Sequence, residues 1–244
     1  MTTELVDKFY EPYKNAGLVP TEIAINGILA LVALVGVCLN SCLIYVTIKS
    51  KSLHSPCNFL IALCAFFASF LLIASTSKFF VFLFGFNYIS LRSCFFMQIA
   101  YCFGAACAAN LQLFIAIDRF FGVVFPLWYN SRGKYCIFKM AFCWSFFNAL
   151  FYSLFLYSEC SKQWERPVMC GMLELSSLPQ NAAFSFAAIG IFVCEFICYL
   201  SIWAIIWCRE EQMPQNVKKI IFSLSIIMVI NLFCFIGTTV FATC

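Results

Sequence analysis

The sequence predicts an all-α protein, a polytopic membrane helical bundle, and two observations lead to this fold class. Of the 244 residues, 64% are hydrophobic and only 11% are charged, whereas a soluble domain carries about 25% charged residues. Six apolar runs are each long enough to cross a bilayer, which takes roughly 20 residues. Because the bilayer interior offers no water to backbone amides, we expect each run to be a helix.

The six predicted spans follow one another with short polar connections between them. They cover Ile23–Ile48, Cys57–Phe84, Arg92–Val124, Tyr135–Tyr157, Gln180–Cys208 and Val217–Phe241. The connections are Lys49–Pro56, Gly85–Leu91, Phe125–Lys134, Ser158–Pro179 and Arg209–Asn216, and none of them is long enough to hold a second domain. We therefore expect an N-terminal tail at residues 1–22 and one transmembrane domain at residues 23–244.

Positive charge predicts how the bundle is oriented. Lys and Arg concentrate on the cytoplasmic side of membrane proteins, and one side of the predicted spans holds Lys49, Lys51, Arg119, Arg132, Lys134, Lys139, Arg209, Lys218 and Lys219. The other side holds Lys8, Lys14, Lys78, Arg92, Lys162 and Arg166. The larger group should face the cytosol, so the N-terminal tail is expected to be extracellular.

Several function classes lack the residues that they need. The net charge of +4 is scattered, with no run of five basic residues, which argues against nucleic acid as a partner. The single histidine, His54, cannot build a His-rich metal site, and no phosphate-binding loop or dinucleotide motif occurs. Most of the sixteen cysteines lie alone in apolar runs, where a thiol behaves as a small hydrophobe. We expect no enzyme, no catalytic residue, no metal and no cofactor.

The third span ends in the segment 118–129, which reads DRFFGVVFPLWY. Apart from Phe120 in place of Tyr, it follows the pattern Asp-Arg-Tyr-x-x-Val-x-x-Pro-Leu-x-Tyr. This pattern ends helix three in rhodopsin-like G-protein-coupled receptors, which the chain resembles. An Asp-Arg pair alone is more often a solvated ion pair at a helix end, so the spaced Val, Pro and Leu carry the comparison.

Further residues support the same resemblance. Asn40 lies in the first span, and the segment 53–63, LHSPCNFLIAL, resembles the first cytoplasmic loop of these receptors, with Asn58 inside it. Trp144 lies in the fourth span, as in the family. Within the superfamily, Ser-Pro-Cys-Asn in this loop and Ala-Ile-Asp-Arg-Phe before Val-Phe-Pro-Leu are most similar to the nematode serpentine chemoreceptors called Srsx, over about residues 26–241.

The resemblance implies a seven-helix receptor fold, from which this chain departs at three places. Six spans are present, and helix seven with its Asn-Pro-x-x-Tyr motif is absent. Ala68 stands where the family carries an acid in helix two, which argues against a sodium site there. The sixth span reads LFCFIG at 232–237 in place of the usual Cys-Trp-x-Pro.

The resemblance also implies a site for G-protein coupling, made of Asp118, Arg119, Phe120, Pro126 and Leu127. An ion pair between Asp118 and Arg119 would hold the guanidinium in the resting receptor, and Leu127 would dock the G protein. The alternatives are an Arg119 side chain that reaches the interface with Asp118 as its counter-ion, and aromatic anchoring of the connection at the headgroup layer.

A disulfide to the second extracellular loop is implied as well. Cys94 lies twenty-five residues before Arg119, where the family places the helix-three cysteine of this bond. Cys170 and Cys160 are the candidate partners. Cys170 is preferred, since Cys160 lies only a few residues past the fourth span and has less reach.

For a ligand, we expect a pocket in the outer half of the bundle, with Lys78, Tyr101, Cys102 and Ala105 as candidates. No carboxylate occurs at this level of the third span, which disfavours an amine ligand. Lys78 could equally extend to the interface, because it lies near the end of its span. The role of Glu195, the only acid deep in a span, stays open between a structural and a signalling one.

These features together predict a chemosensory receptor in the plasma membrane, with sensory neurons as the candidate cell type. Its expected partners are a heterotrimeric G protein, a small-molecule or peptide ligand, membrane lipid and a second copy of the receptor. The alternative is a truncated, non-signalling membrane protein that pairs with a full-length receptor. Asn40, Asn58 and Trp144 are expected to be structural.

Overall fold

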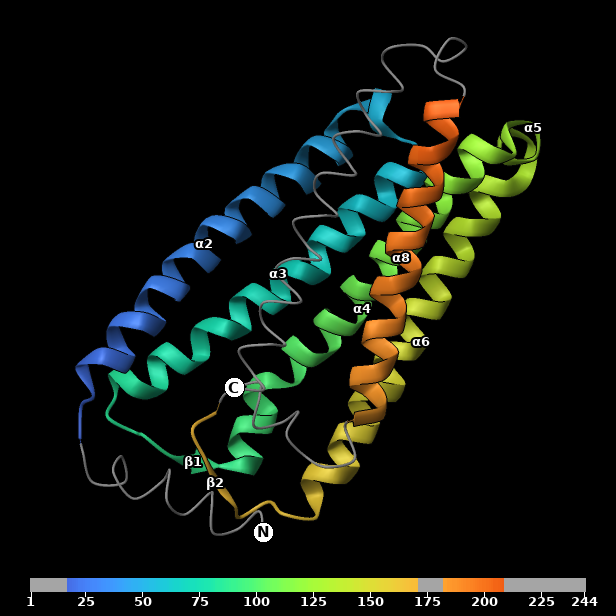
Figure 1. Cartoon of the computed structure of the whole chain (residues 1–244). Helices are drawn as coiled ribbons and strands as arrows, with labels where there is room; N and C mark the ends of the chain where they lie inside the picture. The colour runs from blue at the N-terminus through green and yellow to red at the C-terminus, as the bar shows by residue number, and fades with distance from the viewer. Residues whose placement is uncertain (1–16, 171–181, 209–244) are drawn as a thin grey trace.

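The computed structural model describes residues 17–170 and 182–208, and five long helices make up most of this part (Figure 1). All five are long and apolar enough to cross a membrane, which confirms the predicted fold class. The predicted span Val217–Phe241 and the connection before it lie outside the described residues. The helices are α2 (Pro20–Lys49), α3 (Pro56–Leu83), α4 (Leu91–Val124), α6 (Lys134–Ser161) and α8 (Ala182–Cys208).

The connection from α4 to α6 is helical too. It consists of the short helix α5 (Pro126–Trp128) and the π-helical turn η2 (Tyr129–Gly133). Pro126 begins α5, a position where the missing backbone N–H costs nothing. The Trp128 ring packs over Gly133, where an added Cβ would lie 2.5 Å from a ring carbon. The chain therefore passes from α4 into α6 without the open loop that a polar connection suggests.

Polar side chains cap the helices next to the other connections. Ser55 Oγ accepts a hydrogen bond from the backbone N–H of Asn58 at the start of α3. The Asn58 amide in turn donates to the Leu53 carbonyl at 3.1 Å, at the end of the 3₁₀ turn η1 (Lys51–Leu53). Asn58 thus ties the first connection to α3, a structural role.

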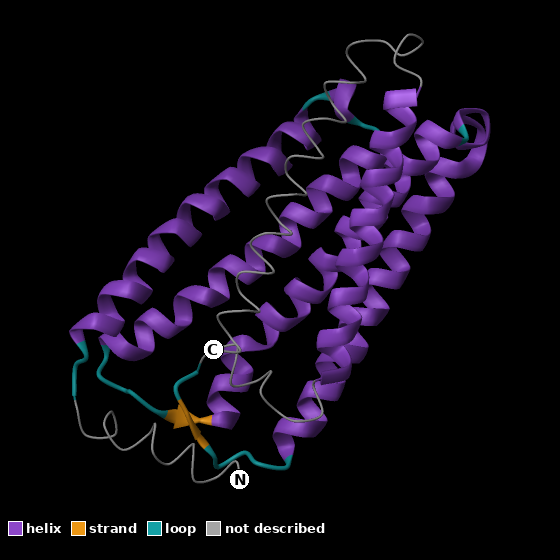
Figure 2. Ribbon diagram, viewed as in Figure 1, coloured by secondary structure: helices purple, strands orange, loops and turns teal. Residues whose placement is uncertain are grey.

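A short antiparallel pair of strands, far apart in the sequence, closes the opposite end of the bundle (Figure 2). Strand β1 (Ile89–Ser90) pairs antiparallel with β2 (Pro167–Val168). The first N–H groups of a helix lack partners within it, and here those of Leu91 and Arg92 donate to backbone carbonyls of the β2 arm at 2.8 and 3.2 Å. The sequence does not predict this strand pair, because two-residue strands carry no detectable pattern. We call this end of the bundle the β-strand end, and the opposite one the α5 end.

The described helices assemble around α4, which packs against α3, α6 and α8, while α2 packs against α3. Gly104 allows the closest approach between α4 and α3. A Cβ at this position would lie 2.7 Å from the Phe67 carbonyl oxygen and 3.0 Å from the Cβ of Phe70. The two backbones are therefore nearer than any side chain at this position would permit.

The outward surface of the bundle is strongly apolar. Large side chains such as Leu31 on α2, Phe147 on α6 and Trp207 on α8 are mostly exposed. Patches of this extent are unusual on soluble monomers, and they match the hydrocarbon layer that helices of this length would cross. Lipid is the solvent that this surface requires.

Replacing Gly104 by Ala should destabilise the bundle, because the new methyl group forces α3 and α4 apart. The expected loss of unfolding free energy is about 1–3 kcal/mol, visible as a lower melting temperature of the protein in detergent. Gly190→Ala in α8 is the matched control, since a Cβ there meets nothing within 4 Å. An equal melting temperature for the two variants would contradict this packing.

Candidate functional site

The α5 end is organised by a hydrogen bond between Tyr129 and Asp118. The Asp118 side chain is 1% exposed, and both of its carboxylate oxygens accept from the Tyr129 hydroxyl at 2.9 Å. The Tyr129 ring passes close to Gly122, where an added Cβ would come within 3.7 Å of it. The end of α4 and the η2 turn are thus joined through one buried carboxylate.

Arg119, the next residue of the motif, makes no ion pair with Asp118. Among the described residues, the ion pair that the structure contains joins Glu159 and Lys162, and the buried Nε of Arg119 has no hydrogen-bond acceptor. The resting ion pair expected from the sequence is therefore not formed in this conformation. Tyr129 takes its place, a role that the sequence analysis missed although this Tyr closes the motif.

The other coupling candidates occupy different surroundings. Phe120 packs against a cluster of Ala116 on α4 with Tyr199 and Ile202 on α8. Leu127 follows Pro126 in α5 and is 89% exposed, the largest exposed fraction among the large apolar side chains of the described residues. Phe120 is therefore part of the helix packing, while Leu127 projects from the α5 end.

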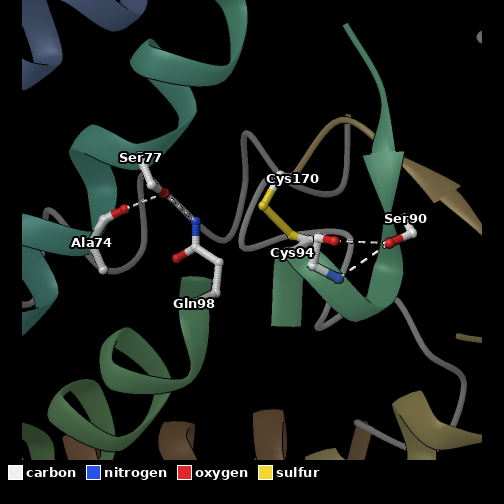
Figure 3. The surroundings of a disulfide bond; sticks show 7 residues. Ala74, Ser77, Ser90, Cys94, Gln98 and Cys170 are labelled. Atoms are coloured by element: carbon white, nitrogen blue, oxygen red, sulfur yellow. Dashed lines mark hydrogen bonds between the residues drawn. A yellow bond between two sulfur atoms is a disulfide. The ribbon is translucent and has the colours of Figure 1, made fainter. Parts of the chain in front are cut away.

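At the β-strand end, a disulfide joins Cys94 in the first turn of α4 to Cys170 beyond β2 (Figure 3). This confirms Cys170 as the preferred partner. Cys160 is a free, fully buried thiol in the last turn of α6, in the same apolar cluster as the disulfide. The bond pins the segment after β2 onto α4.

The ligand candidates come from two helices that pack on each other. Lys78 lies on α3, and its ammonium is 5.7 Å from the centre of the Phe82 ring. Tyr101 and the buried Cys102 lie on α4 and contribute to the cluster around the disulfide. Ala105 follows one turn further along α4 and is half-buried. The structure thus places all four in the half of the bundle nearer the β-strand end or close to the middle of the bundle.

Two polar contacts inside the spans escaped the sequence analysis. Gln98 on α4 donates to the Ser77 hydroxyl on α3 at 3.0 Å. The Trp144 indole donates to the Asn110 side chain at 3.2 Å, linking α6 to α4. Polar residues isolated in apolar runs were the available signal, but their partners depend on how the helices pack. Asn40 is half-buried on α2.

Glu195 is a buried acid with a different environment. It is 1% exposed on α8, and neither carboxyl oxygen has a hydrogen-bond partner in the described part of the chain. A charged carboxylate is unfavourable in such surroundings. Across residues 17–170 and 182–208, no group of three or more His, Cys, Asp or Glu side chains is placed to hold a metal ion.

Comparison with known proteins agrees with this architecture. The model of the family described as "Serpentine type 7TM GPCR chemoreceptor Srsx" matches residues 33–244. Two curated relatives are the trace amine-associated receptor 7d of Rattus norvegicus and 7f of Mus musculus, each 24% identical over 197 residues. The alignments cover 77% of this chain and 53% of each relative. The chain therefore spans about half the length of the curated relatives it matches.

Replacing Tyr129 by Phe should destabilise the α5 end, because the buried Asp118 carboxylate loses its donor. A hydrogen bond to a charged group contributes about 1.5–3 kcal/mol, so the melting temperature should fall and protease should cut the α5–η2 segment faster. Tyr135→Phe is the matched control, since this side chain is exposed. Unchanged melting and cleavage in the Tyr129 variant would show that the bond contributes nothing.

Replacing Cys170 by Ser should remove the cross-link between residues 76 apart in sequence. The variant gains conformational freedom when unfolded, worth about 4–5 kcal/mol for a loop of this size. We expect a lower melting temperature, whereas Cys136→Ser, at an exposed free thiol, should change nothing. Peptide mapping without reductant should recover Cys94 joined to Cys170, and recovery of Cys94 joined to Cys160 would contradict the assignment.

Proposed function

Because the chain belongs to the serpentine chemoreceptor family Srsx, we propose that it binds a small molecule or peptide near the β-strand end and activates a heterotrimeric G protein at the α5 end. The family consists of G-protein-coupled chemoreceptors and not of enzymes. The five long apolar helices fit a multi-pass membrane protein. Lipid and a second copy of the receptor are further partners under this proposal.

In the proposed orientation, the β-strand end faces the exterior of the cell at the plasma membrane, for instance of a sensory neuron. Disulfides form in oxidising compartments, and the Cys94–Cys170 bond lies at this end. The excess of Lys and Arg on the opposite side supports the same orientation. Residues 1–22 are then the extracellular tail, and residues 23–244 are the transmembrane receptor domain.

The exposure of Leu127 is the observation that carries the proposed coupling. Its apolar side chain is 89% exposed at the α5 end, in a short helix that the packing of Trp128 on Gly133 holds in place. An apolar side chain presented on an ordered turn suits insertion into the pocket of a partner protein. Leu127 lies in the segment that directly follows α4, the helix that carries Arg119.

Arg119 and Asp118 would supply the switch. With Asp118 bound to Tyr129, the Arg119 Nε has no acceptor among the described residues. The guanidinium therefore has at least one donor that is not committed to another described residue. A change in the position of α4 would alter both contacts together, as in switches where one packed element has two discrete arrangements.

For the ligand, we propose Lys78, Tyr101, Cys102 and Ala105 as contacts, on the side of the disulfide that faces the middle of the bundle. The names of the two mammalian relatives refer to trace amines. The corresponding level of this chain offers Tyr101 and Cys102 but no carboxylate to balance an ammonium. An amine is accordingly a poorer match for this chain than its relatives' names suggest.

Nucleotide exchange on purified heterotrimeric G proteins tests the coupling with the full chain in lipid vesicles. Arg119→Ala and Leu127→Ala should each lower the ligand-independent exchange rate about tenfold or more, because both remove contacts at the centre of the interface. Leu154→Ala is the control, since this side chain is exposed on α6 away from the α5 end. Melting temperatures verify that each variant is folded.

Exchange that stays at the wild-type rate in both variants would exclude the proposed coupling surface. Exchange that is absent from the wild-type protein with every G-protein class would exclude coupling by this chain. A fall in the Leu154 variant equal to that of Leu127 would show that the effect is not specific to the α5 end.

A further inference from the structure

A buried polar contact bridges α3 and α4 next to the disulfide (Figure 3). The Ser77 hydroxyl donates to the Ala74 carbonyl at 2.6 Å and accepts from the Gln98 amide at 3.0 Å. Gln98 is 3% exposed and lies four residues after Cys94 on the same helix. The amide of Gln98 has a second N–H, which this contact does not use.

Lys78 follows Ser77 and belongs to the inward face of α3. Ala74 and Phe82, one turn before and one turn after it, are both buried, and residues four apart share one face of a helix. The Lys78 ammonium lies 5.7 Å from the centre of the Phe82 ring, which is fully buried. The cation therefore lies beside an aromatic ring of the bundle interior.

No carboxylate balances this ammonium in the part of the chain that the structure describes. Glu22 accepts from Asn26 at the start of α2, and Glu159 pairs with Lys162 at the end of α6. Glu195 lies in the middle of α8, and Asp118 accepts from Tyr129 at the α5 end. Glu165 is exposed just before β2. A charge within a membrane span is costly unless it is paired or solvated, and attraction to an aromatic face compensates only part of that cost.

Gln98 and Tyr101 on α4 add hydrogen-bond donors to this half of the bundle. Tyr101 is three residues beyond Gln98 on α4 and therefore lies on a neighbouring position of the same face. Its hydroxyl, the second N–H of Gln98 and the Lys78 ammonium can all donate to an anion. Charge-assisted hydrogen bonds of this kind are about twice as strong as neutral ones. Donors of this kind, together with the Lys78 cation, favour a negatively charged ligand.

We propose that the ligand carries a carboxylate, which binds the Lys78 ammonium, and an apolar body that extends along Tyr101. This inference rests on the proposed receptor function and specifies the chemical class of its ligand. It also gives Lys78 the anionic partner that the described residues do not provide. An anionic lipid headgroup offers related chemistry, and the experiment separates the two sources.

The test uses the full chain in phosphatidylcholine nanodiscs, which supply no anionic lipid. Benzoate, hydrocinnamate and octanoate are compared with benzylamine, phenylpropylamine and octylamine, which have the same carbon skeletons and opposite charge. We expect at least one carboxylate to raise the melting temperature saturably, and no amine to do so. In Lys78→Met the dissociation constant of that carboxylate should rise about 10- to 100-fold, as the loss of a charged hydrogen bond predicts.

Two variants make the measurement specific. Lys78→Arg keeps the positive charge and should retain binding within a few-fold. Lys162→Met removes an exposed lysine at the same end of the bundle and should leave the dissociation constant unchanged. Retention in the arginine variant, together with loss in the methionine variant, shows that the charge and not the packing of the side chain is responsible.

Several outcomes would overturn the inference. These are saturable stabilisation by an amine and by no carboxylate, equal carboxylate binding in the wild-type and Lys78→Met proteins, and no saturable effect of any carboxylate. Stabilisation by phosphatidylglycerol alone, lost in Lys78→Met, would assign the ammonium to a lipid headgroup instead.

The receptor function fails or stands separately. If exchange by the wild-type protein depends on Arg119 while carboxylates do not bind, the coupling stands and the ligand class is wrong. If carboxylates bind at Lys78 while the wild-type protein catalyses no exchange, the ligand class stands and the coupling is wrong.

Discussion

The structure depends above all on the packing of α4 in the middle of the described helices. This helix contacts α3, α6 and α8, and Gly104 lets its backbone approach α3 to a distance that any larger residue would prevent. Both ends of α4 carry contacts that belong to the proposed sites, with the disulfide at Cys94 and the hydrogen bond at Asp118. A shift of this one helix would therefore be felt at both ends of the bundle.

The membrane environment explains which polar groups the bundle tolerates. Without water, a buried polar side chain needs a partner on its own or a neighbouring helix, and Asn110 with Trp144 and Gln98 with Ser77 meet this need. Buried atoms that lack a hydrogen-bond partner among the described residues include the Glu195 carboxyl oxygens, the Nε of Arg119 and the hydroxyls of Ser145 and Ser153. The Lys78 ammonium makes no ion pair with a described residue. Arg119 and Lys78 belong to the sites proposed for the G protein and the ligand, where a partner would complete them.

Much of the fold follows directly from local sequence. Long apolar runs can only be helices in lipid, so the described helices begin and end within a few residues of the predicted spans. The motif at residues 118–129 and the cysteine at 94 led to the family and to the disulfide with Cys170. The strand pair at Ile89 and Val168 was not foreseen, since it rests on a few backbone hydrogen bonds. The helical form of the α4–α6 connection was not foreseen either, since it depends on one aromatic ring over Gly133.

The sequence by itself therefore determined the membrane environment, the helical class, the family and the identity of the motif residues, because these depend on composition and on residue order. Only the tertiary structure decided that Tyr129 and not Arg119 binds Asp118, that Gln98 bonds Ser77, and that Lys78 lies against a buried ring. The physical reason is that a side-chain partner depends on the rotation and separation of two helices. Many side chains far apart in the sequence contribute to that packing at once, so no short segment encodes it.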